Sequence, residues 1–237
     1  GQVIKKIAEA DSKVEIVAGV DQFQGVQNPY PVFSSMEACD AEADVVIDFS
    51  NAAAVDGLLD YCVNRQLPVV FVPRDFSEAQ LEKVEKAAEQ TAVLKSANMS
   101  MGINLLMKLL KDAAKVLALG YDIELVERHH NQKVDAPSGT ALALADSVNE
   151  ALDHEYTYVY DSKQSPTKKE EKEIGISAVR GGTIVGEHEV IFAGMDEVIE
   201  FSIQHIPEAV GKGAVEAAKF LAGKTAGMYD MSDVIQF

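Results

Sequence analysis

The chain has 237 residues, of which 38 are acidic and 21 basic, so its formal net charge is −17. This acidic balance argues against nucleic acid or an anionic membrane as the main partner. The shares of hydrophobic and charged residues, 47% and 25%, exclude intrinsic disorder of the whole chain, and no apolar stretch approaches the roughly 20 residues of a membrane span.

The first hundred residues alternate between two periodicities. Helical stretches carry apolar residues on one face, and one of them starts with Ser77 as N-cap and Gln80 in the position of a capping box. Short apolar runs typical of buried strands lie between these helices. This order predicts a parallel sheet with helices on both faces. The expected helices are 1–10, 52–65 and 77–90, and the expected strands are 14–20, 44–49, 67–72 and 92–95.

The pattern changes after residue 100. Helices are now followed by strand-like runs with turn residues between them, and both Gly181-Gly182 and Gly194-Met195-Asp196 predict hairpins. The polar segment 163–172 predicts a mobile loop. We therefore expect an α/β part followed by an α+β part with a mixed, largely antiparallel sheet. The expected helices are 101–119, 137–152 and 208–223, and the expected strands are 122–129, 156–160, 174–180, 184–192 and 198–206.

The opening of the chain fits part of a dinucleotide-binding unit, which runs strand, glycine loop, helix, strand and then an acid about 20 residues beyond the glycines. The helix, the second strand and the acid are present, because Asp21 lies 20 positions after Gly1. The first strand and its loop are absent, and Gly1 fits the last glycine of such a loop. We expect the natural protein to have residues upstream of Gly1. The alternative, that Asp21 is only a turn residue, stays open.

The stretch 124–140, ELVERHHNQKVDAPSGT, joins a strand to a helix and carries the most informative side chains. His129, His130 and Lys133 place three potential cations within five positions. The helix expected from Pro137 directs its first amides outward, so the sequence predicts an anion site that would bind carboxylates on an otherwise acidic chain. A His beside a Lys also supplies a proton donor near neutral pH.

Two other interpretations of this stretch stay open. His129 and His130, helped by Glu124 or Glu127, are residue types that bind zinc, although adjacent residues on a strand point to opposite faces. The second alternative is a loop with a purely structural role.

The segment 96–100 lies between the last expected parallel strand and the helix that follows. Ligands bind outside the carboxyl ends of parallel strands, so we expect the backbone of Ser96, Ala97, Asn98 and Met99 to face a cofactor. A simple helix cap is the alternative.

Two cysteines, Cys39 and Cys62, are too few for a disulfide framework, and neither lies in a CxxC or Cys/His cluster. Reduced thiols are usual in the cytosol, so we expect a cytoplasmic protein. The start of the chain lacks the continuous apolar run of a signal peptide.

The motifs resemble those of the dihydrodipicolinate reductase family. Residues 127–141 match the long, residue-specific family signature E-x-H-H-x-x-K-x-D-A-P-S-G-T-A. Shorter matches run along most of the chain: the D-F-[ST] strand end at 46–50, the N-[MF]-S-x-G-x-N motif at 98–104, the R-x-G…G-x-H-x-V pattern at 180–190 and a loop end at 1–4.

The resemblance implies a reductase of lysine (diaminopimelate) biosynthesis that passes hydride from NADH or NADPH to a cyclic, unsaturated dicarboxylate while a proton is added next to it. His129 matches the family's proton donor, and Lys133 matches its second acid and substrate anchor. His130, Gly139 and Thr140 match contacts to the substrate carboxylates, and no metal ligand is implied. The expected cofactor contacts are Gly1, Asp21, Phe49, Ser96, Ala97, Asn98 and Met99.

The resemblance also implies two domains and an assembly. A Rossmann-like dinucleotide-binding domain, without its first strand and glycine loop, would comprise residues 1–100 and 207–237. Residues 101–206 would form the substrate-binding and oligomerisation domain, through whose sheets the family assembles as a homotetramer.

The chain departs from the family pattern at three places. The glycine loop is absent, Val72-Pro73-Arg74-Asp75 stands where the family carries G-T-T-G, and Ile206-Pro207 stands where an S-R/K pair is usual. The alternative function is therefore a truncated or degenerate relative that binds a dicarboxylate or self-associates without catalysis. Asp21 followed by Gln22 predicts a preference for NADH, because an acid repels the 2′-phosphate of NADPH.

Overall fold

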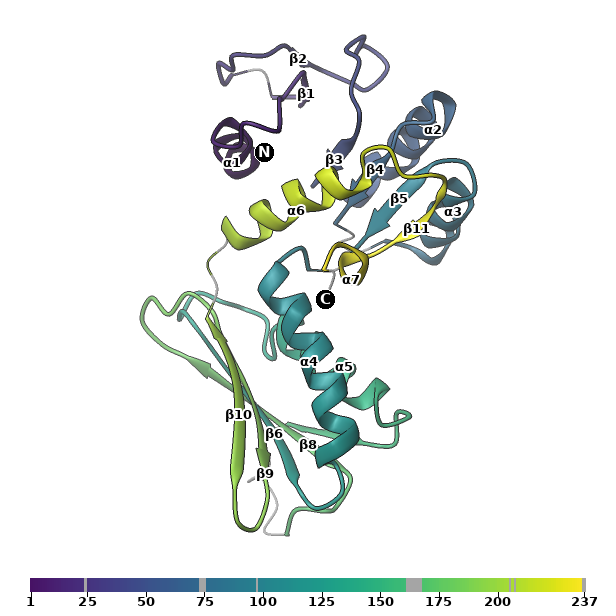
Figure 1. Ribbon diagram of the computed structural model, residues 1–237. Coiled ribbons are helices and arrows are strands. Elements are labelled where there is room, and N and C mark those ends of the chain that lie inside the picture. The colour runs from purple at the N-terminus through teal and green to yellow at the C-terminus, as the bar shows by residue number, and fades with distance from the viewer. Residues whose placement is uncertain are drawn as a thin grey trace. The chain divides into compact units, whose positions relative to one another are not determined.

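The computed structural model describes residues 1–23, 25–72, 76–96, 98–160, 168–204, 206 and 208–235. The chain divides into two compact units, one of Gly1–Met101 with Glu208–Phe237 and one of Gly102–Pro207. Each unit is built on its own main sheet (Figure 1). Buried hydrophobic residues form two clusters in the described part of the first unit and one cluster in that of the second. In the described part of the chain, no helix is long and apolar enough to cross a membrane.

The first unit is built on a four-stranded parallel sheet in the order β11-β5-β4-β3. Side chains alternate across β4, so Val69 and Phe71 pack with α2 and α3 whereas Val70 packs with α6. Helices therefore cover both faces of this sheet, as the near-continuous apolar strands predict. The elements are α1 (Gln2–Glu9), β3 (Val46–Asp48), a 3₁₀ turn (Ala52–Ala54), α2 (Val55–Arg65), β4 (Val69–Phe71), α3 (Glu78–Ala88), β5 (Ala92–Lys95), α6 (Glu208–Leu221), β11 (Gly227–Tyr229) and α7 (Met231–Val234).

Two short strands, β1 (Gly19–Val20) and β2 (Val32–Phe33), form a separate parallel pair. The strand predicted at 14–20 is therefore wrong in length, since only its last two residues find a ladder partner among the described residues. A strand persists only where a neighbour takes its backbone hydrogen bonds. The sequence did not predict β2, β11 and α7, which have at most four residues and so show no clear periodicity.

The backbone of α6 packs closely against the segment that follows β5. A Cβ added at Gly213 would lie 1.6 Å from the backbone oxygen of Met99, so only glycine fits there. The predicted capping box of α3 is confirmed, because Ser77 and Gln80 satisfy each other's backbone N–H groups.

The second unit has a five-stranded mixed sheet in the order β10-β9-β6-β8-β7, with two helices packed on one face (Figure 1). Ile123 and Leu125 of β6 are buried beneath Leu110 of α4 and Leu144 of α5. The elements are α4 (Met101–Leu117), β6 (Asp122–His129), α5 (Gly139–Glu150), β7 (Thr157–Tyr160), β8 (Glu173–Arg180), β9 (Glu187–Ala193) and β10 (Val198–Gln204). The predicted mobile loop at 163–172 lies partly outside the described residues.

One of the two predicted hairpins is wrong. The strands β8 and β9 on either side of Gly181-Gly182 are not neighbours, because β6 lies between them, parallel to β8 and antiparallel to β9. A glycine pair signals a turn, but it does not say which strand takes the central place in the sheet. The hairpin β9–β10 is confirmed, with the Gly194 N–H bonded to the Glu197 oxygen. The described sheet thus has two parallel and two antiparallel pairings, so it is mixed but not largely antiparallel.

Candidate active site

The end of β6 brings a histidine and a carboxylate together on the buried face of the sheet. Glu127 and His129 are two positions apart, so the alternation of a strand puts them on one face. Glu127 has no exposed surface and His129 is 7% exposed. The Nδ1 atom of His129 lies 2.6 Å from Oε2 of Glu127, a short contact of the kind that ionised partners favour.

Arg180, the last residue of β8, forms a bidentate ion pair with the carboxylate of Glu127. It is the ladder partner of His129, and its two terminal nitrogens donate to the two oxygens of Glu127 at 2.7 Å each. One of them also donates to the backbone oxygen of Asp135, at 2.6 Å. Burial by itself would raise the pKa of Glu127, but hydrogen bonds from Arg180, His129 and the backbone of Ser138 outweigh it and lower that pKa below its usual range.

Ser138 ties the start of α5 to the same carboxylate. Its backbone N–H donates to Glu127 at 3.0 Å, and its hydroxyl caps the helix by accepting the N–H of Ala141. The hydroxyl also lies 2.9 Å from Nε2 of His188 on β9, whose ring stands edge-on to His129 at 5.2 Å between centroids. Because Ser138 is the cap, the helix begins at Gly139, two residues later than the sequence predicted.

The loop between β6 and α5 and the first turn of α5 carry the remaining predicted substrate contacts. Lys133 donates its backbone N–H to the oxygen of His130, and its ammonium binds Asp135 at 2.8 Å. That contact with Lys133 lowers the pKa of Asp135. Gly139 is exposed and Thr140 half-buried in the first turn of α5. The predicted substrate residues therefore lie on one segment, and the hydrogen bonds of Arg180 and Glu127 anchor that segment to the sheet.

The predicted cofactor contacts lie in the first unit, mostly after its parallel strands. Phe49 follows β3 and Ser96 follows β5, so both lie at the carboxyl edge of the sheet. Ser96 donates its hydroxyl to the oxygen of Asn98, and the Asn98 side chain accepts the N–H of Ser100, each at 2.8 Å. Met99 is fully buried in the core, so its side chain is structural. Ala97 lies outside the described residues, as does the segment 73–75.

The other two predicted cofactor contacts are exposed. Asp21 directly follows β1, and its side chain accepts the N–H of Phe23 at 2.8 Å in a local turn. Gly1 precedes α1 and its oxygen accepts the N–H of Lys5. A Cβ added at Gly1 would meet nothing within 4 Å.

The sequence did not identify Arg180, Ser138 and His188 as site residues, and Glu127 entered only as a helper of a zinc site. Strand alternation was the signal for Glu127, since it lies two residues before His129. Arg180 and His188 are the arginine and the histidine of the R-x-G…G-x-H-x-V pattern, but that pattern does not show the contact of Arg180 with Glu127, 53 positions earlier in the chain. Among the described residues no group of three or more His, Cys, Asp and Glu side chains is placed to hold a metal ion.

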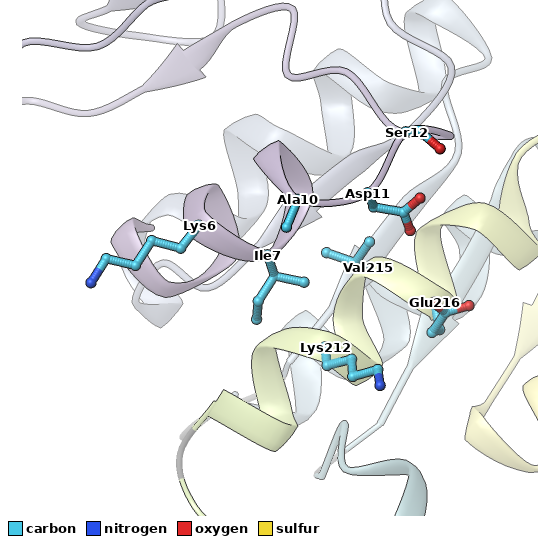
Figure 2. A pocket seen from close by; sticks show the side chains of 8 residues that line it. All are labelled: Lys6, Ile7, Ala10, Asp11, Ser12, Lys212, Val215 and Glu216. Atoms are coloured by element: carbon cyan, nitrogen blue, oxygen red, sulfur yellow. The ribbon is translucent and has the colours of Figure 1, made fainter.

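An open groove in the first unit lies elsewhere, between α1 with its following turn and α6 (Figure 2). Lys6 and Lys212 line it together with Asp11 and Glu216, so its charges are balanced. None of the predicted site residues lines this groove, and nothing in its lining favours an anion.

Both halves of the chain match models of one protein family. Residues 1–99 match the model for the N-terminus of dihydrodipicolinate reductase, and residues 102–235 match the model for its C-terminus. The 4-hydroxy-tetrahydrodipicolinate reductase of Caldanaerobacter subterraneus subsp. tengcongensis is 48% identical over 237 residues, which are 100% of this chain and 94% of that protein. The reductase of the same name from Clostridium novyi is 45% identical with the same coverage.

Solved structures support the same fold. A dipicolinate-bound dihydrodipicolinate reductase from Paenisporosarcina sp. TG-14 superposes with a TM-score of 0.84 at 20% identity, and the match covers 100% of this chain and 95% of that one. A myo-inositol dehydrogenase from Sinorhizobium meliloti 1021, named as putative, reaches 0.60 at 12% identity, with 99% and 89% covered. The predicted fold class, a Rossmann-like part with a second mixed-sheet part, is thereby confirmed.

Proposed function

The chain belongs to the dihydrodipicolinate reductase family, and we propose that the polar cluster around His129 is its active site. The reaction is the NAD(P)H-dependent reduction of 4-hydroxy-tetrahydrodipicolinate, a step of lysine (diaminopimelate) biosynthesis. The observation that carries the proposal is the contact of 2.6 Å between His129 and the buried Glu127, beside the N-terminus of α5.

In the proposed mechanism His129 is the proton donor. An imidazolium held against a carboxylate is a suitable general acid near neutral pH, because it supplies a proton without a large reorganisation of its surroundings. Lys133 is the second acid and substrate anchor. Its ammonium and the imidazolium stabilise the negative charge that develops on the ring as it is reduced.

The substrate carboxylates bind at the start of α5 and on the preceding loop. The N-terminus of a helix attracts anions through its backbone N–H groups, and Gly139 leaves that surface open because it has no side chain. His130 and Lys133 add positive charge nearby, and Thr140 adds a hydroxyl. This local charge offsets the repulsion from a chain with a net charge of −17.

The first unit offers a donor set that fits a nicotinamide dinucleotide. The exposed Asp21 carboxylate after β1 suits ribose hydroxyls, and Phe49, Ser96 and Asn98 lie where parallel sheets bind nucleotides. Ala97 and the backbone at Met99 complete this set in the proposal, with Gly1 at the start of α1. When bound, the cofactor supplies the hydride.

NADH is the preferred cofactor in this proposal. The carboxylate of Asp21 would repel the 2′-phosphate of NADPH, and Gln22 brings no positive charge to receive it.

We also propose a cytoplasmic homotetramer that assembles through the face of the second sheet opposite α4 and α5. Apolar side chains on this face keep part of their surface accessible, among them Val126, Val179, Ile191 and Val198. The two free, buried thiols Cys39 and Cys62 support a reducing compartment.

The proposal is tested by steady-state kinetics of the full chain and of Lys133→Ala. We expect the full chain to oxidise NADH in the presence of 4-hydroxy-tetrahydrodipicolinate, and Lys133→Ala to lower kcat and to raise the KM for this substrate, because the residue has both roles. An unchanged Lys133→Ala enzyme would contradict the assignment. Binding of the dicarboxylate without any turnover would support the non-catalytic alternative.

A further inference from the structure

We propose that Glu127 is a positioning residue that fixes which nitrogen of His129 carries the exchangeable proton, with Arg180 holding Glu127 in its charged form. The inference rests on the proposed role of His129 as the acid. It assigns Nδ1 of that ring a permanent hydrogen and makes Nε2 the atom that gives the proton to the substrate.

The hydrogen bonds that Glu127 accepts show where the hydrogen of its contact with His129 lies. Its two oxygens take two bonds from Arg180, one from the backbone N–H of Ser138 and one contact from Nδ1 of His129. The guanidinium and the backbone N–H are donors under all conditions. An ionised carboxylate accepts hydrogen bonds and has none to donate, so the hydrogen in the remaining contact belongs to Nδ1.

Arg180 keeps the buried Glu127 in its ionised form. A carboxyl group with no exposed surface would normally favour its neutral form. Arg180 reverses this preference through two bonds of 2.7 Å in the fork geometry of a guanidinium and a carboxylate. The lowered pKa of Glu127 agrees with a group that stays ionised at neutral pH.

The groups around the ring of His129 hold it in one orientation. Among the described residues, the charged or titratable groups that face His129 include Glu127 on its own strand, Arg180 on β8 and His188 on β9. His188 packs edge-on against the ring and so restricts its rotation. With Nδ1 bound to Glu127 and the ring held in place, a proton enters or leaves His129 at Nε2 only.

Glu127 also connects the acid to the carboxylate-binding end of α5. One of its oxygens faces His129 while the other accepts the N–H of Ser138, the residue that caps the helix. A single buried carboxylate thus sets the position of the proton donor relative to the helix start that binds the substrate. Such supporting contacts around a reactive group commonly decide its orientation.

Long-range ¹H–¹⁵N spectra of the histidine rings test the inference without turnover. The chain has five histidines, and the His129→Gln variant assigns the signals of His129. We expect Nδ1 of His129 to bear a hydrogen at every pH at which the fold persists, with only Nε2 changing its state. In Glu127→Gln the second tautomer appears, since an amide both donates and accepts. A wild-type His129 with a hydrogen on Nε2 and none on Nδ1 would overturn the proposal.

Kinetics of the same variant separate positioning from general damage. We expect Glu127→Gln to lower kcat roughly tenfold or more while the substrate KM stays within about threefold, because the amide oxygen still accepts the N–H of Ser138. The matched control is Glu124→Gln, the same change on the same strand but on the opposite face, where Glu124 pairs with Lys169. This control should keep both the kcat and the tautomer of His129.

The outcomes separate the two proposals. Normal turnover of His129→Gln would remove the acid role while the tautomer of His129 stayed as expected. If the wild type shows the other tautomer of His129 while His129→Gln is inactive, the proposed role of Glu127 is wrong but the acid role of His129 stands. If Glu127→Gln does not fold, the wild-type spectrum still tests the role of Glu127, because it shows whether Nδ1 of His129 bears the hydrogen.

Discussion

The two units hold their predicted site residues in different ways. In the second unit, His129 belongs to a buried cluster whose bonds join β6, β8, β9 and α5. In the first unit, the side chains of Asp21 and Asn98 each accept a backbone N–H from the residue two positions further along the chain. Hydrogen bonds between distant segments thus hold His129 in place, whereas Asp21 and Asn98 lie in local turns of the backbone. Substitutions in the cluster should therefore affect fold and catalysis together, and those in the turns should affect cofactor selection.

The largest effect is expected from His129→Gln. Glutamine keeps a similar shape and hydrogen-bonding capacity but has no proton to give near neutral pH, so kcat should fall by roughly 10²–10⁴ with little change in KM. Steady-state and single-turnover kinetics of the full chain measure this. A His129→Gln enzyme with normal kcat would remove His129 from the mechanism.

The next largest effect is expected for the stability of the cluster. Arg180→Ala would leave the fully buried Glu127 without its strongest partner, and the loss of one member of a buried pair costs about 3–5 kcal/mol. Lys83→Ala is the control in the first unit. It removes ion pairs of Lys83 with the exposed Asp56 and Asp60, and such pairs contribute about 0–1 kcal/mol. Urea unfolding measures the free energy of unfolding of both variants. Equal losses of this free energy would show that the cluster around Glu127 is no more important for stability than a surface ion pair.

The contribution of Glu127 to the stability of the fold should depend on pH. The folded pKa of Glu127 lies below its ordinary value of 4.5, so the stabilisation from its ionised form is complete above that value and is lost as the pH falls through the folded pKa. The difference in Tm between the wild type and Glu127→Gln should thus be constant near neutral pH and shrink in acid. A difference that does not depend on pH would mean that the charge of Glu127 contributes nothing to folding.

A smaller effect is expected at the exposed turn after β1. Asp21→Ser with Gln22→Arg removes the negative charge and adds a positive one, so the ratio of kcat/KM for NADPH to that for NADH should rise about tenfold or more. The stability of the chain should stay within about 0.5 kcal/mol, since both residues are exposed. Equal or better turnover of the wild type with NADPH than with NADH would contradict the predicted preference.

Local patterns in the sequence were sufficient to predict most helices and strands and part of the candidate active site. The strand β6 and the capping box of α3 follow from short-range periodicity and spacing, and the loop from His129 to Thr140 is one continuous motif. The contact of Arg180 with Glu127 could not be predicted from local patterns, because it depends on the parallel pairing of β6 with β8. The glycine pair after Arg180 suggested a hairpin with β9 instead, and that wrong pairing concealed the contact with Glu127.

We expect the loop after β6 and the start of α5 to bind a doubly negative ring. A crystal structure of the full chain with 2,6-pyridinedicarboxylate, a planar analogue of the product, tests it most directly. We expect one carboxylate of the analogue on the backbone N–H groups and hydroxyl at Gly139 and Thr140, with His130 and Lys133 beside the ring. An analogue bound away from these residues would contradict the claim.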